Sequence, residues 1–426
     1  MKVLHVITGL GVGGAERQLR LLLRHLPARC DVVTLTNPGA VAEGLRADGV
    51  RVRHLGMRGN RDLAAVPRLA RLVRHGGYDL VHTHLYRACV HGRTAARLAG
   101  TPSVATEHSL GREEIEGRPL TRGTRALYLR TERLGAATVA VSSTVAARLR
   151  AWGVPSARIH TVPNGIDASA FRFDGGRRRA ARALLGLPGD AFVVGGVGRL
   201  VPGKRFDATV RAVADLPGAW LLLAGDGPEA GALRALAARL GVADRVRFAG
   251  ECGEGAAPDV PAVLAAMDVF VSASREESFG LAVVEALAAG LPVVHGACPA
   301  VEDLPSGQAP EGAVRLRSPT DPAAELTAVL RRHLAHGPRR LPVPRALDHY
   351  DIRLSGRRLM DVYAHALGGP APAPFVPTAP SVPAAPAAPA APAAPAEPYI
   401  PSDLYAPSAP YAPSCPPAPS IRRAHR

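Results

Sequence analysis

Short β-branched apolar runs alternate with amphipathic helical stretches, and this alternation constrains the fold more than any other feature of the chain. KVLHVI at residues 2–7 is followed by AERQLRLLLRHL at 15–26, and CDVVTLT, DLVHTH and PSVATEH follow with helical stretches between them. Apolar runs of this length are typical of parallel strands that are buried on both faces. The pattern predicts βαβ units, in which helices cover both sides of a parallel sheet.

The alternation breaks near VPNGIDASAFRFDGG at 162–176 and restarts with FVVGGVGRL at 192–200. The fold class predicted is therefore α/β, with two doubly wound, Rossmann-like parallel-sheet domains that face each other across a ligand-binding cleft. The boundaries that we expect are 1–168 for the first domain, 169–345 for the second, 346–368 for a last helix and 369–426 for a tail.

The tail is rich in Pro and Ala, as in PAAPAAPAAPAAPAEP, and cannot bury a core. We expect it to be extended and disordered. Tyr399, Tyr405 and Tyr411 recur every six residues within it. The repeat fits either a segment that recruits a partner or low-complexity drift.

The positive charge of the chain is concentrated in its first part. Residues 1–168 hold 25 basic and 12 acidic side chains, an excess of 13 out of a net charge of +16. Such a domain favours a negative partner, such as an anionic membrane or a phosphorylated acceptor, although solvated arginines on helix faces would give the same count. Five scattered cysteines without a Cys-x-x-Cys pair, and an N-terminus unlike a signal peptide, predict a cytoplasmic protein.

GLGVGGAE follows the first apolar run and opens a helical stretch, so its glycines lie where a strand meets a helix. Gly9-x-Gly11-x-x-Gly14 matches a dinucleotide fingerprint. However, the second strand ends in LTNPG, without the acidic residue that would hold a ribose. The run therefore indicates a helix N-terminus that receives a phosphate, or else a purely structural turn.

VGRLVPGK places two cations at the end of a predicted central strand. Of the 52 basic residues only Lys2 and Lys204 are lysines, and Lys204 follows Arg199 by five positions. An arginine fork beside a mobile ammonium suits a diphosphate leaving group, on which negative charge builds as its bond to a sugar breaks. The alternative is a pair of solvated loop cations.

SREESFGLAVVEAL carries two glutamates eight positions apart, Glu277 before a predicted helix and Glu285 within it. Carboxylates accept hydrogen bonds from sugar and ribose hydroxyls. The alternative is a helix cap together with an ordinary helix residue.

Taken together, these motifs resemble the retaining glycosyltransferases of the GT-B fold, specifically family 4, also called group 1. The matching pieces are GGAE at 13–16, VPNGID at 162–167, GRLVPGK at 198–204, LLLAGDGPE at 221–229 and Glu277-x7-Glu285, and they cover the chain to about residue 367.

The resemblance implies a role for each matched position. Arg199 and Lys204, with Gly198, would hold the diphosphate, while Glu277 and His108 would contact the transferred sugar. The remaining donor-binding positions would be Gly13 and Gly14 at the distal phosphate, Gly250, Glu251 and Cys252 around the base, the backbone N–H groups of Phe279, Gly280 and Leu281, and Glu285 at the ribose.

The resemblance also implies chemistry without a protein nucleophile, in which the leaving phosphate takes the proton of the acceptor and the anomeric configuration is retained. The chain has no Asp-x-Asp pair of the kind that holds a diphosphate-bound metal, so we expect no metal and no cofactor. It departs from the family in ACPAVED, where Pro299 follows Cys298 in place of a glycine-rich turn and only Glu302 could stand for the usual glutamate.

The partners that we expect are a nucleotide-sugar donor, a glycan or lipid-linked acceptor of cell-surface polysaccharide or glycolipid synthesis, and no nucleic acid. RPLTRGTRALYLRTERLG at 118–135 mixes arginines with leucines and could rest on an anionic membrane. The alternatives are an epimerase or phosphorylase on the same scaffold, or a non-catalytic nucleotide-binding module with a recruiting tail.

Overall fold

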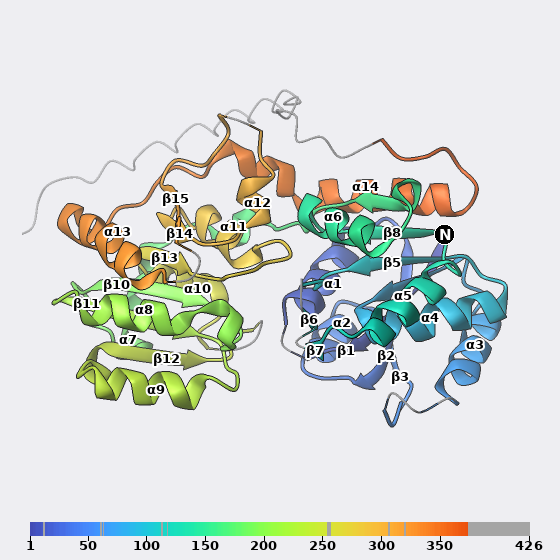
Figure 1. Ribbon diagram of the computed structural model, residues 1–426, viewed down its shortest axis with the longest axis horizontal. Helices are drawn as coiled ribbons and strands as arrows, with labels where there is room; N and C mark the ends of the chain where they lie inside the picture. Colours follow the sequence, from blue (N-terminus) through green and yellow to red (C-terminus); the bar gives the residue numbers. More distant parts are fainter. Residues whose placement is uncertain are drawn as a thin grey trace, which may run out of the picture. The chain divides into compact units, whose positions relative to one another are not determined.

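The computed structural model describes residues 1–373 except 12, 60, 61, 63, 112, 113, 117, 254–256, 306, 319 and 320. Two parallel sheets, each covered by helices on both faces, make up this part of the chain (Figure 1). The prediction of two doubly wound α/β domains is confirmed. The domain boundaries stay predictions, and the expected disorder of the tail concerns residues that lie almost wholly outside the described ones.

The first sheet has the strand order β3-β2-β1-β4-β5-β8-β9 among the described residues. Its strands are β1 (Lys2–Gly9), β2 (Arg29–Asn37), β3 (Arg51–His54), β4 (Leu80–His84), β5 (Ser103–Glu107), β8 (Ala137–Ala140) and β9 (Ile159–Thr161). Its helices are α1 (Gly14–His25), α2 (Val41–Ala47), α3 (Ala65–Gly76), α4 (Tyr86–Ala99), α5 (Arg122–Glu132) and α6 (Ser143–Trp152). A short antiparallel pair, β6 (Glu114–Ile115) and β7 (Arg118–Pro119), precedes α5.

The second sheet has the order β12-β11-β10-β13-β14-β15, which repeats the same winding. Its strands are β10 (Phe192–Val197), β11 (Ala219–Ala224), β12 (Val246–Gly250), β13 (Val269–Ser272), β14 (Val293–His295) and β15 (Ala313–Arg315). Its helices are α7 (Gly175–Leu185), α8 (Phe206–Ala214), α9 (Ala230–Arg239), α10 (Val260–Ala266), α11 (Leu281–Ala288), α12 (Pro299–Glu302) and α13 (Ala323–His336).

Alternate residues of the strands face opposite helix layers, as a pleated strand requires. In β1, Val3 and Ile7 pack with α1, α2 and the last helix, α14 (Ile352–Ala366), whereas Leu4 and Val6 pack with α3 and α4. Both layers are buried, which explains why the strands read as nearly continuous apolar runs.

α14 returns to the first sheet after the second one is complete. Its Leu359 and Val362 are buried in the same cluster as Val3 and Ile7. The chain also crosses itself at Ile166, whose N–H donates to the carbonyl of Tyr350 at 2.7 Å. Segments more than 180 residues apart in sequence therefore share one core.

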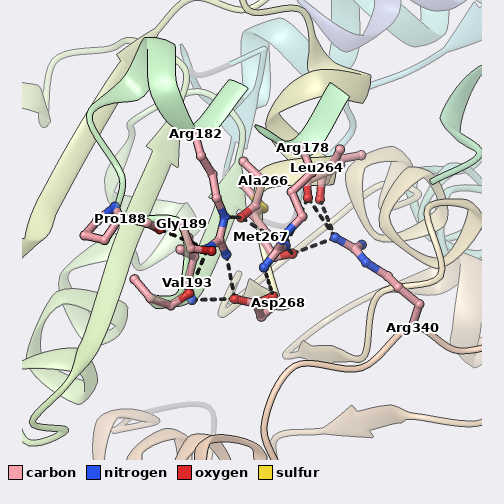
Figure 2. Close-up of polar contacts among 12 residues, drawn as sticks. Arg178, Arg182, Pro188, Gly189, Val193, Leu264, Ala266, Met267, Asp268 and Arg340 are labelled. Atoms are coloured by element: carbon pink, nitrogen blue, oxygen red, sulfur yellow. Dashed lines mark hydrogen bonds and ion pairs between the residues drawn. The ribbon is translucent and has the colours of Figure 1, made fainter. Parts of the chain in front are cut away.

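Three arginines brace the amino edge of the second sheet around the buried Asp268 (Figure 2). The Asp268 carboxylate accepts hydrogen bonds from Arg178 at 2.7 Å, from Arg182 at 2.8 Å and from the Val193 N–H at 2.8 Å. Arg340 donates to the Met267 carbonyl at 2.7 Å. The guanidinium groups thus satisfy carbonyls at the C-terminus of α10, where a helix leaves acceptors unpaired and carries partial negative charge.

Replacing Asp268 with Asn should lower the free energy of unfolding by about 3 kcal/mol, because it leaves buried guanidinium groups without their counter-charge. Urea unfolding followed by circular dichroism measures the change. Asp361→Asn, at an exposed position of α14, is the matched control and should leave the midpoint unchanged. Equal midpoints for the two variants would contradict this account of the network.

Candidate active site

Both sheets reverse their strand order at a central strand, β1 in the first and β10 in the second. Ligands of doubly wound sheets bind beyond the carboxyl ends of the strands at such a reversal, because the connecting helices there lead to opposite faces. Gly13 and Gly14 follow β1, Arg199 and Lys204 follow β10, and Glu277 follows β13. The predicted site residues therefore collect at the edges where this fold binds ligands.

Lys204 and Glu277 form an ion pair between the loops after β10 and β13. Lys204 ends the short 3-10 helix Pro202–Lys204, and the N–H of Arg275 donates to the carbonyl of Gly203 at 3.0 Å, which ties the two loops together. The Lys204 side chain remains 30% exposed, whereas that of Glu277 is 14% exposed. The ammonium is thus fixed in place and still open to a ligand.

Arg199 lies at the end of β10 and is exposed. Burial raises the pKa of Glu16 in α1. The backbone N–H of Glu16 and the positive charge of Arg199 both oppose this rise. Arg199 and Lys204 follow the same strand but have different acidic neighbours, so they do not form one closed cluster.

Glu285 is buried in α11, where its carboxylate lies 3.4 Å from the guanidinium of Arg17 in α1. Burial raises the pKa of Glu285, and the charge of Arg17 opposes that rise. Arg17 also opposes the rise that burial causes in the pKa of the Cys252 thiol. The carboxylate expected at the ribose is therefore held by a cation from the first sheet's helix layer.

The N-terminus of α11 offers backbone N–H groups beside these side chains. Gly280 is the N-cap residue with φ +101°, and a Cβ there would lie 2.5 Å from the sulfur of Cys298. A side chain at this position would be both strained and crowded, which explains the glycine. Phe279 is buried beneath it, and Leu281 begins the helix within 3.7 Å of where a Gly14 side chain would start.

Gly13 is the N-cap of α1, and the Glu16 carboxylate occupies the space that a side chain at 13 would need. Gly14 is exposed and begins α1, where a helix leaves its N–H groups without acceptors in the helix itself. The structure brings Gly14 and α11 close together, as expected for two parts of one donor site.

The segment predicted to hold the base follows β12. The N–H of Gly225 donates a hydrogen bond to the carbonyl of Gly250 at 2.7 Å. Cys252, two residues after Gly250, is buried. Glu251 is exposed. Residues 254–256, just beyond, are outside the described part of the chain.

His108 lies at the other edge of the site, directly after β5. It is half-buried, and its Nε2 is 3.1 Å from Nδ1 of His84 at the end of β4. Burial lowers the pKa of His108 to about 4, so the ring is neutral near pH 7.

The turn that departs from the family is an ordinary capped helix. The Cys298 N–H donates to the Glu302 carboxylate at 3.0 Å, four residues on, and the same carboxylate lies 3.2 Å from Arg315. Glu302 is thus engaged at the N-terminus of α12 instead of being free for a ligand.

Two family models match the two halves of the chain. Glycosyltransferase Family 4 matches residues 12–170, and Glycosyl transferases group 1 matches residues 191–336. D-inositol 3-phosphate glycosyltransferase 1 of Catenulispora acidiphila is 35% identical over 329 residues, which are 68% of this chain and 77% of that protein. The chain belongs to the family 4, group 1 glycosyltransferases.

Further relatives of this glycosyltransferase agree. D-inositol 3-phosphate glycosyltransferase of Mycobacterium tuberculosis is 36% identical over 249 residues, but these are only 55% of this chain and 50% of that protein. The crystal structure of Anabaena HepE in complex with UDP-glucose has a TM-score of 0.75 at 22% identity, covering 86% of this chain and 100% of that one. A glycosyltransferase from Rickettsia africae has a TM-score of 0.67 at 15% identity, with 86% and 98% covered. These structures establish the shared GT-B fold.

Arg17 is a site residue that the sequence analysis missed. It follows Glu16 directly, so the signal was present in GGAER, but the helix pattern alone does not say which face meets Glu285. Contacts between the two halves of the glycosyltransferase were missed too: Ser142 donates to the Ser278 carbonyl at 2.6 Å, and the Ser143 N–H donates to Asp303 at 2.9 Å. Ser278 and Asp303 lie within the quoted stretches SREESFGLAVVEAL and ACPAVED, but nothing in those stretches indicates Ser142 and Ser143 as their partners.

Replacing Glu285 with Gln should weaken nucleotide binding about tenfold near pH 8, because a charged acceptor is lost. The pKa of Glu285 is raised by burial, so wild-type Glu285 takes up its proton at a higher pH than an ordinary glutamate, and its advantage shrinks as the pH falls through that raised pKa. Calorimetric titration with UDP between about pH 5 and pH 8 gives the ratio of the two Kd values, in which the titration of UDP itself cancels. A ratio that stays constant with pH would show that Glu285 does not contact the nucleotide as a carboxylate.

Proposed function

We propose that this glycosyltransferase moves a sugar from a nucleoside diphosphate sugar to an acceptor hydroxyl with retention of the anomeric configuration and without a metal ion. The observation that carries the proposal is the placement of Arg199 and Lys204 beyond the carboxyl end of β10. Two cations at the reversal of strand order supply the charge that a departing diphosphate needs. Two related structures, of HepE in complex with UDP-glucose and of HepE in complex with UDP and glucose, support a donor of this class.

In the proposed reaction the bond between the anomeric carbon and the diphosphate oxygen breaks first, and the electron pair stays on that oxygen. Arg199 and Lys204 stabilise the growing charge, and the N–H groups at the start of α11 add partial positive charge. The acceptor oxygen then bonds to the anomeric carbon on the same face, while its proton passes to the leaving phosphate. Glu277, held by its ion pair with Lys204, orients the sugar and is no nucleophile in this reaction, because the acceptor oxygen itself bonds to the anomeric carbon.

A phosphorylated cyclitol is a second candidate acceptor beside a glycan or lipid-linked one. The relative from Catenulispora acidiphila is named for D-inositol 3-phosphate, and this chain covers 77% of its length. The excess of 13 positive charges in residues 1–168 favours a phosphate-bearing acceptor of either kind.

A peripheral position on an anionic membrane is also proposed. Among the described residues no helix is long and apolar enough to span a bilayer. The outward side of α5 combines cations with exposed leucines: Arg122, Leu127 and Arg130 on the helix, and Leu134 just after it. Such a face can rest on phosphate headgroups while its leucines enter the boundary of the acyl chains.

A screen of nucleotide sugars by turnover tests the function, and Lys204→Ala tests its mechanism. The variant should lose about 100-fold or more in kcat, because one fixed charge next to the developing phosphate is removed. Lys2→Ala, at the one other lysine, is the matched control and should keep wild-type turnover. Unchanged turnover in Lys204→Ala would remove the mechanism.

The same assay tests the finer parts of this proposal. Activity should persist after treatment with EDTA, and NMR of the first product formed should show the anomeric configuration of the donor. Inversion of the anomer, or a requirement for a divalent ion, would contradict that part while leaving sugar transfer intact.

Flotation with liposomes tests the membrane proposal. Vesicles with anionic lipid should carry the protein upward, and Arg122→Glu with Arg130→Glu should weaken this binding about 30-fold or more, because two basic side chains that each contribute about 1 kcal/mol near the surface are lost. Neutral vesicles are the control for charge. Equal binding to both kinds of vesicle, or none to either, would contradict the proposed docking through α5.

A further inference from the structure

Three histidine rings form a hydrogen-bonded file from the middle of the first sheet to its carboxyl edge. Nδ1 of His5 lies 3.0 Å from Nε2 of His84, and Nδ1 of His84 lies 3.1 Å from Nε2 of His108. The His5 and His84 rings are stacked, with their planes 16° apart. The resemblance to the family 4 glycosyltransferases implies a role, contact with the transferred sugar, only for the last member of this file, His108.

The strand register explains how the file forms. His5 lies between Val3 and Ile7 on the face that packs with α14, and it pairs in register with His82 of β4. His84 is two residues further along β4, so it lies on the same face, one step nearer the carboxyl edge. β5 then delivers His108 just beyond that edge.

His82 stands beside the file and holds it in place. Its two ring nitrogens lie 2.6 Å from the Tyr363 hydroxyl of α14 and 2.7 Å from the Thr106 hydroxyl of β5. Its ring centroid is 4.1 Å from that of His84. The nearby carboxylate of Glu107 accepts a hydrogen bond from Tyr128. His5, His84 and His108 thus act on one another without an acidic partner in the file.

All three rings of the file are neutral near pH 7. Burial lowers the pKa of His5 to about 3, the pKa of His108 to about 4 and the pKa of His84 well below its usual value. A neutral imidazole has one N–H and one bare nitrogen. Each contact in the file needs one of each, so the three protons must all point the same way along the file.

The two ends of the file decide the direction. Among the described residues, Nε2 of His5 and Nδ1 of His108 are both buried without a hydrogen-bond partner. If the protons point inward, the terminal N–H lies on His5, which is fully buried in the sheet. If they point outward, it lies on His108, which lines a pocket with Thr106, Asn164 and Gln18. A buried N–H without an acceptor is costly at either end. A ligand in the pocket that His108 lines can supply an acceptor there, whereas His5 is fully buried in the sheet, so the outward direction is favoured.

We propose that His5 and His84 are positioning residues that hold His108 in the tautomer with its proton on Nδ1, so that His108 presents an N–H donor to a hydroxyl or oxygen of the bound sugar. This rests on the proposed function, because it takes His108 as the residue that contacts the transferred sugar. A partner that fixes the tautomer of an imidazole decides whether that imidazole donates or accepts a hydrogen bond.

A metal site is the competing interpretation of the same rings. One ligand atom from each of His5, His82 and His84 lies within 4.8 Å of the others. However, both nitrogens of His82 and both of His84 already lie at hydrogen-bond distance from a partner. A bound ion would have to break at least two of these contacts, one of His82 and one of His84, whereas the file satisfies them.

NMR of the full chain labelled with ¹⁵N-histidine tests the proposal, because long-range ¹H–¹⁵N correlations distinguish a protonated ring nitrogen from a bare one. Without substrate, His108 should carry its proton on Nδ1, opposite to the preference of free histidine for Nε2. His108→Asn assigns the signal by its loss. A proton on Nε2 of His108 would overturn the proposal, and so would displacement of the His84 signals by stoichiometric Zn²⁺.

Two variants at His5 test the coupling along the file. His5→Leu removes the first donor, so His108 should turn toward the Nε2 proton and kcat should fall about tenfold. His5→Asn places an amide N–H where Nδ1 was, so it should keep both the tautomer and the rate. An unchanged His108 tautomer in a folded His5→Leu protein would overturn the coupling; if that variant does not fold, the wild-type tautomer still decides.

The outcome also separates this proposal from the function on which it rests. The tautomer is read without any donor, so an enzyme that turns over no nucleotide sugar but keeps Nδ1 protonated would contradict the proposed function alone. An active enzyme with the proton on Nε2 would contradict the file alone.

Discussion

The reversal of strand order at β1 and at β10 is the constraint on which the site depends. At each reversal the loops after two neighbouring strands lead to helices on opposite faces, which leaves space beyond the strand ends that no helix covers. Lys204 and Glu277 meet because β10 and β13 are neighbours at such a point. His84 and the glycines after β1 gather at the equivalent point of the first sheet because β1 and β4 are neighbours there.

A network of hydrogen bonds and ion pairs at the amino edge of the second sheet holds the strands that lead to the site. Arg178, Arg182 and Arg340 satisfy Asp268 and the carbonyls around it at the amino ends of β10 and β13. β10 and β13 are therefore held by hydrogen bonds at their amino ends, while the loops at their carboxyl ends carry charged side chains that a ligand can reach. Because the amino ends are fixed, the loops after β10 and β13 keep their relative positions, so Lys204 is held in place and is still open to a ligand.

The sequence was sufficient for whatever depends on local pattern. The two α/β domains, the strand ends that carry Arg199 and Lys204, and the helix after Glu277 all follow from runs of a few residues. The Arg17–Glu285 pair and the histidine file could not be predicted in the same way, because each requires knowing which helix face or strand register meets another 24 to 268 residues away. The alternating histidines of VHTH gave a partial signal, since residues two apart in a strand share a face. Nothing in ACPAVED indicated that Glu302 would bond to its own helix N-terminus, because that contact depends on the turn that Cys298 and Pro299 adopt.

The return of α14 to the first sheet has a consequence for how the protein is made. The Tyr363 hydroxyl bonds to His82 across 281 positions of sequence, and Leu359 and Val362 complete the core around Val3 and Ile7. During synthesis the first half leaves the ribosome long before α14 is made, so one face of the first sheet stays incompletely covered while the second half folds. Translation must therefore pass residue 363 before His82 has its partner Tyr363. A chain that stopped after the second sheet would have both sheets, but the core of its first sheet would lack the residues of α14.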